Sequence, residues 1–320
     1  MMLDPRVDIG HVHLKVADID RAVAFYRDAL GFDLQQQLGG QAAFLSAGGY
    51  HHHVGLNTWE SAGGSPPPPG TTGLFHVAVR HPSRESLARA LRRVLDHGIG
   101  LEGATDHGYS ESVYLYDPDG SGVELFCDKP RDLWPVSADG SLGTARSPLD
   151  LDLLLAEATD ACGPLDPRVD IGHVHLKVAD LERSLAFWRD TIGLDLRKRY
   201  SDEAAFLSAG GYHHHIAVNT WESRGGSPPP LGTTGLYHVA VRFPNRQSLA
   251  QALRRVIEAG YPLAGASDHG VSEAIYLDDP DGCGVELYRD RPREEWPRTR
   301  DGGLAMVTER LDLRALLTEA

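Results

Sequence analysis

The chain opens with alternating polar and apolar residues, a pattern typical of a strand with one buried face. Residues 11–16 read HVHLKV. Because side chains along a strand point alternately to its two faces, His11 and His13 share one face and the intervening apolar residues share the other. Asp18 then precedes an amphipathic stretch at residues 19–30, which predicts a helix whose first turn is capped by that aspartate.

The pattern that follows predicts a repeated unit of one strand, one helix and three strands. Three short strands are expected after the first helix, and four consecutive prolines then exclude residues 61–73 from the interior of a sheet. The same βαβββ order is expected next, with a Ser83 cap on its helix and a DPDG turn before its last strand. The further strands are expected at 32–37, 42–47, 51–59, 74–80, 100–105, 112–117 and 122–127, and the second helix at 83–98.

The whole pattern then occurs a second time. Residues 3–158 match residues 165–320 without a gap, at a constant offset of 162 positions. A period of this length indicates duplicated domains, because the repeats of a solenoid are only about 20–50 residues long. We therefore predict an α+β fold of four tandem βαβββ modules in two domains, residues 1–158 and 163–320, joined near residues 159–163. Each domain is expected to form a cupped, mostly antiparallel sheet with helices outside.

The composition excludes several classes of function. The 41% of hydrophobic and 24% of charged residues are typical of a globular protein, and no run of about 18 apolar residues is present to span a bilayer. The net charge of −14 disfavours a nucleic-acid or an anionic membrane partner. Three cysteines and a first segment unlike a signal peptide favour a reducing, cytoplasmic location. The composition leaves both a monomer and a homo-oligomer open.

Histidines are the chemically informative residues, since the chain has 16 of them and several are clustered. Strand alternation places His11, His76 and Glu124 on the polar faces of three different strands, pointing into a common cleft. Two imidazoles and a carboxylate form the facial triad that binds Fe(II), Mn(II) or similar ions and leaves coordination positions open. On residue chemistry alone, a structural role for these side chains also stays open. The second copy repeats the set as His173, His238 and Glu286.

These motifs resemble those of the vicinal oxygen chelate superfamily, which includes glyoxalase I, bleomycin-resistance proteins and extradiol catechol dioxygenases. The resemblance rests on the opening HVHLKVADIDRAVAFYRDALGF, the middle GLFHVAVR and the closing YLYDPDGSGVELF, and it covers nearly the whole chain. The four-module layout is similar to that of catechol 2,3-dioxygenases. Their metal ligands lie in the opening strand, at the start of the next module and in the last strand, which are the positions of the triads above.

The resemblance implies further site residues. In extradiol dioxygenases a tyrosine ten residues before the metal glutamate contacts the substrate, and the second member of a His-His pair is the acid–base group. A loop histidine precedes that tyrosine, although the spacing in this chain is shorter than the family's. The implied tyrosines are Tyr114 and Tyr276, the acid–base histidines are His53 and His215, and the loop histidines are His107 and His269; His13 and its repeat His175 have the strand parity to contact substrate.

The resemblance favours a metal-dependent extradiol dioxygenase that cleaves a catechol-type ring. The expected cofactor is a divalent metal, with Fe(II) as the first choice and Mn, Ni, Co or Zn as alternatives. The expected partners are a small aromatic substrate and dioxygen. In characterised four-module extradiol enzymes usually only the C-terminal pair of modules binds iron, whereas both halves of this chain keep the triad.

Two other functions stay open. Glyoxalase I has a fourth ligand, a glutamate, in the strand where His53 is expected, so a site of three histidines and one glutamate would indicate a lyase or isomerase. A metal-free binding protein of the bleomycin-resistance kind would need a large ligand groove and no metal.

Overall fold

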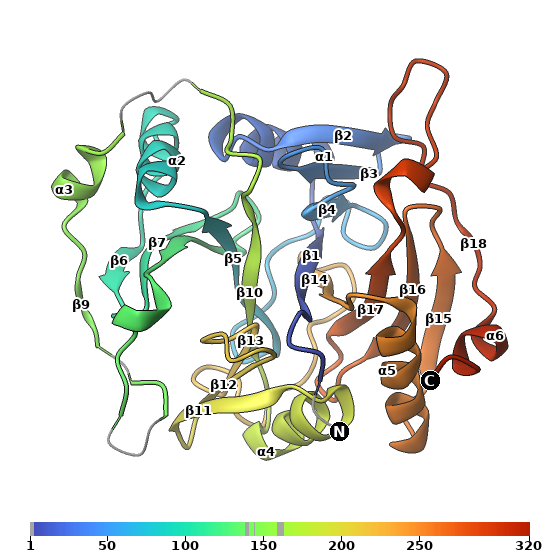
Figure 1. Ribbon diagram of the computed structural model, residues 1–320. Helices are drawn as coiled ribbons and strands as arrows, with labels where there is room; N and C mark the ends of the chain where they lie inside the picture. Colours follow the sequence, from blue (N-terminus) through green and yellow to red (C-terminus); the bar gives the residue numbers. More distant parts are fainter. Residues whose placement is uncertain (1–2, 138–140, 144, 159–162) are drawn as a thin grey trace.

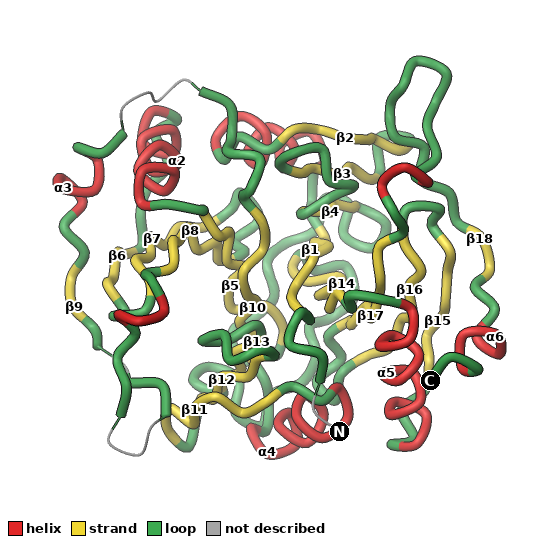
Figure 2. The backbone as a smooth tube through the Cα atoms, viewed as in Figure 1, coloured by secondary structure: helices red, strands yellow, loops and turns green. Residues whose placement is uncertain are grey.

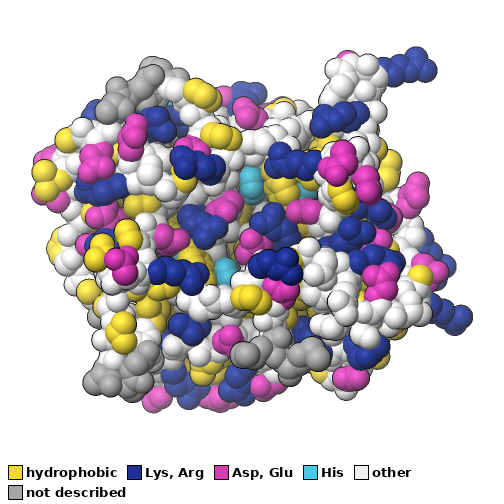
Figure 3. All heavy atoms as spheres, in the orientation of Figure 1, with side chains coloured by type: hydrophobic (Ala, Val, Ile, Leu, Met, Phe, Trp, Pro, Cys, Tyr) yellow, Lys and Arg dark blue, Asp and Glu magenta, His cyan; other side chains and the backbone are white. Residues whose placement is uncertain are grey.

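The computed structural model describes residues 3–137, 141–143, 145–158 and 163–320. Within them the chain forms two nine-stranded sheets, with the longer helices at the periphery (Figures 1 and 2). The predicted joint near residues 159–163 lies largely outside the described part. In the residues that are described, no helix is long and apolar enough to cross a membrane. Side chains of both charges are interspersed on the face drawn in Figure 3, with histidines visible between them.

All four predicted βαβββ modules are present, which confirms the predicted fold class. Module 1 contains β1 (Asp8–Lys15), α1 (Ile19–Ala24), β2 (Asp33–Leu38), β3 (Ala42–Ser46) and β4 (Val54–Asn57). Module 2 contains β5 (Gly73–His81), α2 (Arg84–Asp96), β6 (Gly103–Asp106), β7 (Ser110–Tyr116) and β8 (Gly122–Asp128). Module 3 contains β10 (Asp170–Lys177), α4 (Leu181–Leu185), β11 (Asp195–Ser201), β12 (Ala204–Ser208) and β13 (Ile216–Asn219). Module 4 contains β14 (Gly235–Arg242), α5 (Arg246–Glu258), β15 (Leu263–Asp268), β16 (Ser272–Asp278) and β17 (Gly284–Asp290).

Shorter elements complete the fold. The first helix of modules 1 and 3 continues into a π-helical turn, so each predicted helix is irregular at its C-terminal end. The side chain of Asp18 accepts a hydrogen bond from the amide of Arg21, as expected of a cap. The short elements are η1 (Phe25–Ala29), η2 (Arg131–Leu133), β9 (Ser147–Pro148), α3 (Leu151–Leu155), η3 (Ala186–Ile192), η4 (Arg293–Glu295), β18 (Glu309–Arg310) and α6 (Leu313–Leu317).

Each sheet combines modules from both halves of the chain, which corrects the expectation that each half forms its own sheet. One sheet has the order β18-β15-β16-β17-β14-β1-β4-β3-β2, and the other has the order β11-β12-β13-β10-β5-β8-β7-β6-β9. Strand β1 therefore pairs with β14 of module 4, and β10 pairs with β5 of module 2. Since β5 and β14 have almost the same sequence, hydrophobic patterning could not discriminate between the two pairings. The domain boundaries within the sequence stay a prediction.

The proline-rich loops after β4 and β13 carry the chain from one sheet to the other. Prolines cannot donate to a sheet ladder and favour extended backbone, which suits a crossing segment. The two loops meet where they cross, because the amide of Thr234 donates to the carbonyl of Ser65 at 3.0 Å. The approach is close enough that a Cβ on Gly64 would lie 2.2 Å from the carbonyl oxygen of Gly232, so glycine is required there.

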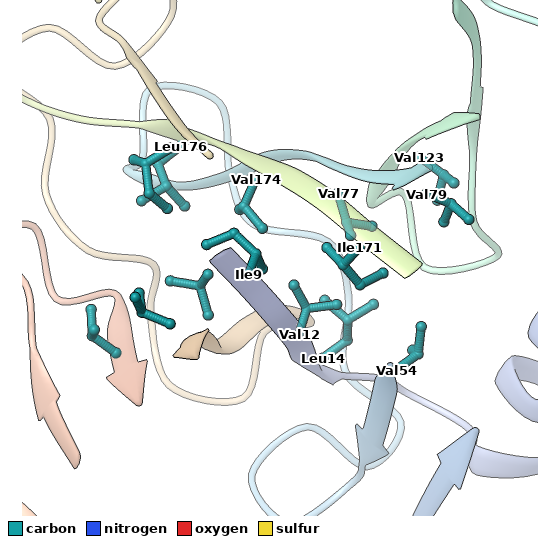
Figure 4. Packing of buried hydrophobic residues seen from close by; sticks show 14 of the residues in the cluster. Ile9, Val12, Leu14, Val54, Val77, Val79, Val123, Ile171, Val174 and Leu176 are labelled. Carbon is teal, nitrogen blue, oxygen red and sulfur yellow. The ribbon is translucent and has the colours of Figure 1, made fainter. Parts of the chain in front are cut away.

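The apolar faces of the two sheets meet at their central strands, β1 and β10 (Figure 4). Val12 and Leu14 of β1 and Val174 of β10 are fully buried in this shared core. Helix α2 covers β5 and β8, and α5 packs on β17. Because residues alternate along each strand, the histidines of β1 and β10 are left on the opposite, concave face of each sheet.

Candidate metal centres and the adjoining cavity

Strand register brings residues from the two halves into one polar row. His11 of β1 is paired with Ala240 of β14, which is paired in turn with Glu286 of β17. Tyr276 of β16 continues the row beside Glu286. Laterally paired residues point to the same face, and the small side chain of Ala240 leaves space between its neighbours. His238 lies two residues before Ala240 and therefore reaches the same space.

The donor atoms of this set, named here the His11 site, converge. The Nε2 atom of His11 lies 3.3 Å from Nε2 of His238 and 3.1 Å from Oε2 of Glu286. Nε2 of His238 lies 3.0 Å from the same carboxylate oxygen. Burial lowers the pKa of His11 to about 4, against the opposing effect of Glu286. Burial would raise the pKa of Glu286, but the two imidazoles hold it well below its usual range.

The equivalent set, named the His76 site, has the same geometry. The Nε2 atoms of His76 and His173 are 3.3 Å apart, and they lie 3.0 Å and 3.1 Å from Oε2 of Glu124. The predicted ligands are therefore brought together, but the predicted grouping within each half is wrong. Each site takes its first histidine from one half and its second histidine and glutamate from the other, because the sheets are assembled across the halves.

Both sets fit a divalent transition-metal ion. Two imidazoles and one carboxylate suit Fe(II), Mn(II) and similar ions. Ligands bound at about 2.1 Å on adjacent octahedral positions are roughly 3 Å apart, close to the separations of these donor atoms. All six side chains are buried, and a buried carboxylate requires charged or hydrogen-bonding partners. In the described residues, His213 and His214 also approach His173 closely enough to form a further three-histidine group.

A cavity of about 660 Å³ opens beside the His11 site. Its floor includes two of the candidate ligands, and its walls are largely apolar and aromatic, as is usual for a site that holds a small organic molecule. The predicted substrate-contact residue His13 lies in this wall, with its ring centre 5.1 Å from that of His238. His175 has the same place at the other site, 5.0 Å from His76.

A tyrosine–histidine pair adjoins each centre. Nε2 of His269 lies 2.8 Å from the hydroxyl of Tyr276, and both residues line the cavity. Nδ1 of His269 donates to the carbonyl oxygen of Val307, so in the neutral ring Nε2 accepts the tyrosine proton. Burial and the Glu286 carboxylate raise the pKa of Tyr276 well above its ordinary value, which keeps its hydroxyl protonated. His107 and Tyr114 form the same 2.8 Å pair in the His76 site.

The structure places His52, not the predicted His53, in the cavity. Strand β4 begins at Val54, so the predicted strand is too long at its start and residue alternation does not apply to the three histidines. Nδ1 of His53 accepts a hydrogen bond from the amide of Ala47. The ring of His52 lines the cavity, 4.0 Å from the ring of His11 between centres. The second copy behaves alike, with His215 bonded to the amide of Ala209 and His214 beside His173.

Two residues that sequence reasoning left out hold His52 in place. Nε2 of His51 lies 2.9 Å from Oδ1 of Asp290, and its Nδ1 lies 2.8 Å from Nδ1 of His52. A neutral His51 that donates to the carboxylate must accept at Nδ1, so His52 donates there and keeps Nε2 as a proton acceptor. Burial lowers the pKa of His52 well below its ordinary value, which favours this neutral form. No signal in the triple-histidine run indicated which of its members would face the cavity.

Comparison with known proteins defines the class. The Glyoxalase/Bleomycin resistance protein/Dioxygenase superfamily matches residues 8–125 and 170–287. The chain belongs to this superfamily, which confirms the resemblance noted from the sequence. It is 37% identical over 257 residues to a catechol-2,3-dioxygenase of Bacillus subtilis (strain 168), a match that covers 80% of this chain and 89% of that protein.

Solved structures show the same fold at lower sequence identity. A Bacillus subtilis protein superimposes with a TM-score of 0.66 at 16% identity, over 91% of this chain and 87% of its own. Glyoxalase I from Zea mays superimposes with a TM-score of 0.53 at 18% identity, over 88% and 92% of the two chains. The fold is thus shared by relatives with different reactions, so the reaction has to be argued from the site.

Proposed function

We propose that this protein is a metal-dependent extradiol dioxygenase that cleaves a catechol-type aromatic ring, with Fe(II) at both centres. The observation that carries the proposal is the convergence, beside one cavity, of a two-histidine, one-carboxylate set, a tyrosine–histidine pair and a further histidine with a free acceptor nitrogen. The similarity to a catechol-2,3-dioxygenase over most of both chains supports it.

In this proposal, some residues of the site hold the aromatic ring and others transfer its protons. A bound Fe(II) ion would lower the pKa of a coordinated catechol hydroxyl and keep the ring and dioxygen close together. Nε2 of His52 is the acceptor for the second hydroxyl proton, since its Nδ1 proton is engaged by His51. Tyr276 pairs with Glu286 on the neighbouring strand, and its hydroxyl, whose proton is donated to His269, can accept a hydrogen bond from a catechol hydroxyl. Apolar and aromatic side chains of the cavity wall provide surface against which the ring can pack.

The test is metal content and dioxygen uptake on one sample purified without air. The proposal expects nearly two Fe per chain and one dioxygen consumed for each catechol, because both oxygen atoms enter the ring-opened product. The ring-opened product is followed by its visible absorbance. Metal binding without dioxygen uptake would contradict the proposal, and so would failure to bind Fe, Mn, Ni or Zn after reconstitution.

A second function is a lyase or isomerase that moves a proton at a centre with four protein ligands. It is favoured by the closeness of His52 to His11, and of His213 and His214 to His173, which would supply an additional imidazole. Substitution of Co(II) for the metal distinguishes the two functions, because the spectrum of the Co(II) protein reports the number of imidazole ligands. Three histidines per metal would support this second function over the first.

A further inference from the structure

The walls of the two sites differ at a pair of equivalent positions, 271 and 109. Val271 lines the cavity of the His11 site. Tyr109 occupies the equivalent position beside the His76 site and is almost completely buried. Burial and the Glu124 carboxylate raise the pKa of its hydroxyl.

The Tyr109 ring stands where the other site has the smaller side chain of Val271, and it packs against two histidine rings. It stacks on His213 at 4.7 Å and on His107 at 5.8 Å between ring centres. It thus lies between His107, the loop histidine, and His213 of the triple-histidine run. In the His11 site Val271 belongs to a buried cluster with Tyr50 and Trp296, and Val271 and His269 both line the cavity.

Other residues that line the cavity also differ between the two halves. Leu38 lines the cavity of the His11 site, and its equivalent is Tyr200, whose ring centre lies 6.2 Å from that of Phe206. Among the other cavity residues, Ala264 and Asp278 correspond to the larger Glu102 and Tyr116, whereas Val307 and Tyr237 correspond to the smaller Ala145 and Phe75. Position 144, the equivalent of the cavity residue Met306, lies outside the described residues.

We propose that the two sites select catechols of different sizes. The His11 site takes rings that carry a bulky apolar substituent, and the His76 site takes only small rings because Tyr109 occupies the space such a substituent would need. This inference rests on the proposed function, in which both sites act on a catechol. Pockets discriminate one or a few methylene groups by roughly 10- to 200-fold, so a whole ring in the wall is sufficient for clear selectivity.

The test uses two proteins that each keep one site. Glu124→Ala leaves the His11 site, and Glu286→Ala leaves the His76 site. Each is loaded with Fe(II) without air, and its affinities for catechol, 4-tert-butylcatechol and 3-phenylcatechol are measured by calorimetric titration. Tyr109→Val is then added to the protein that keeps the His76 site, and Val271→Tyr to the protein that keeps the His11 site. Tyr109→Phe is the matched control, because it keeps the ring and removes only the hydroxyl.

The affinity for the bulky catechols relative to catechol is expected to be at least about tenfold higher in the His11-site protein. Tyr109→Val should raise this ratio by about tenfold, Val271→Tyr should lower it by a similar factor, and Tyr109→Phe should leave it unchanged. Equal ratios in the two single-site proteins, no response to the exchanges, or no catechol binding would overturn the inference. Dioxygen uptake on the same samples is read separately: size-selective binding without uptake would contradict the proposed reaction and retain the division by size.

Discussion

The two candidate centres have the same inner residues in different surroundings. In each, the donor atoms lie 3.0–3.3 Å apart, and a histidine nitrogen lies 2.8 Å from a tyrosine hydroxyl. Differences begin two residues along the strand from the glutamate, where Tyr288 in one half corresponds to Phe126 in the other. The comparison shows that the two copies are alike where donor atoms must converge and differ among the residues that surround them.

The largest expected effect comes from removing one glutamate ligand at a time. Glu286→Ala should reduce the metal content from two per chain to one, because the remaining two histidines supply no negative charge to the ion. Glu124→Ala should do the same at the other site, and the double variant should bind no metal. Elemental analysis of the purified proteins is the measurement. Each single variant removes a ligand from only one of the two sheets, so the site on the other sheet should keep its metal.

The exposed Glu258 at the end of α5 provides a matched control for this experiment. Glu258→Gln removes a carboxylate of the same kind far from either donor set and should keep two metal ions. A single variant that loses both metals would show that the sites are not independent. Full loading of Glu286→Ala would exclude this glutamate as a ligand.

The next largest effect is a difference in turnover between variants of the adjacent residues His52 and His53. His52→Ala should lower turnover at the His11 site by about 10²- to 10⁴-fold with the metal retained, as expected when a general base is removed. His53→Gln should change turnover only a few-fold, because glutamine can still accept from the amide of Ala47. Steady-state dioxygen uptake in the Glu124→Ala background measures one site alone. Equal losses in the two variants would restore His53 as a candidate base.

The pattern of residues was sufficient to predict the modules but not their partners. Alternation along β1 and β17 correctly separated His11 and Glu286 from their apolar neighbours, since that separation is local to a strand. The two proline-rich loops cross between the sheets, and this crossing places β14 beside β1. The sequences of β5 and β14 are nearly identical, so they could not indicate which of the two strands pairs with β1. All six predicted ligands are therefore gathered in two sets, whereas their expected grouping was wrong.

The assignment of the base failed for a different physical reason. The argument for His53 assumed a regular strand from residue 51, but Tyr50 to His53 are irregular and the ladder starts only at Val54. One residue of shift at the start of a strand exchanges the inward and outward side chains. Asp290, which lies at the end of a strand in module 4, could not be connected to the histidine run before the pairing of modules 1 and 4 was known.

The two DPDG turns offer a third comparison, in stability. Burial raises the pKa of Asp117 to about 6 and that of Asp279 to about 7. Tyr26 donates a hydrogen bond to Asp117. Its equivalent in the repeat is Trp188, and in the described residues neither Nε1 of Trp188 nor Oδ2 of Asp279 has a hydrogen-bond partner. The lost hydrogen bond to the carboxylate accounts for the direction of the difference between the two turns.

The sign of the pH dependence follows from these raised values. An unfolded aspartate releases its proton near pH 3.8, whereas the folded chain keeps these two protons until about pH 6 and 7. Between those limits the folded state binds more protons, so the free energy of unfolding falls as pH rises. The decrease should be about 3 kcal/mol from Asp117 and about 4 kcal/mol from Asp279, complete by about pH 8. Below pH 3.8 both contributions to the pH dependence vanish.

Asparagine substitutions measure each contribution by urea unfolding at several pH values. Asp279→Asn should remove the larger part of the slope between pH 4 and 8, and Asp117→Asn the smaller part, because asparagine keeps an acceptor oxygen and does not titrate. Trp188→Tyr should reduce the Asp279 contribution toward that of Asp117 by restoring the hydroxyl donor. A slope that is unchanged in both asparagine variants would show that these carboxyls titrate normally in the folded chain.

The smallest expected effect concerns the hydroxyl that distinguishes Tyr288 from Phe126. It lies 2.7 Å from the hydroxyl of Tyr50, which also bonds Asp290 at 2.9 Å. In the other half Tyr212 bonds its aspartate at the same distance beside a phenylalanine, so the arrangement persists without the extra hydroxyl.

Tyr288→Phe should therefore lower the free energy of unfolding by only about 1 kcal/mol, the usual net value of one hydrogen bond. The loss should disappear in a Tyr50→Phe background, where no hydroxyl partner remains, and this double-mutant cycle is read from urea midpoints. A loss above about 3 kcal/mol would mean that the fold depends on the Tyr288 hydroxyl, although the equivalent Phe126 has none. The side-chain packing of the two halves would then differ more than their backbones do.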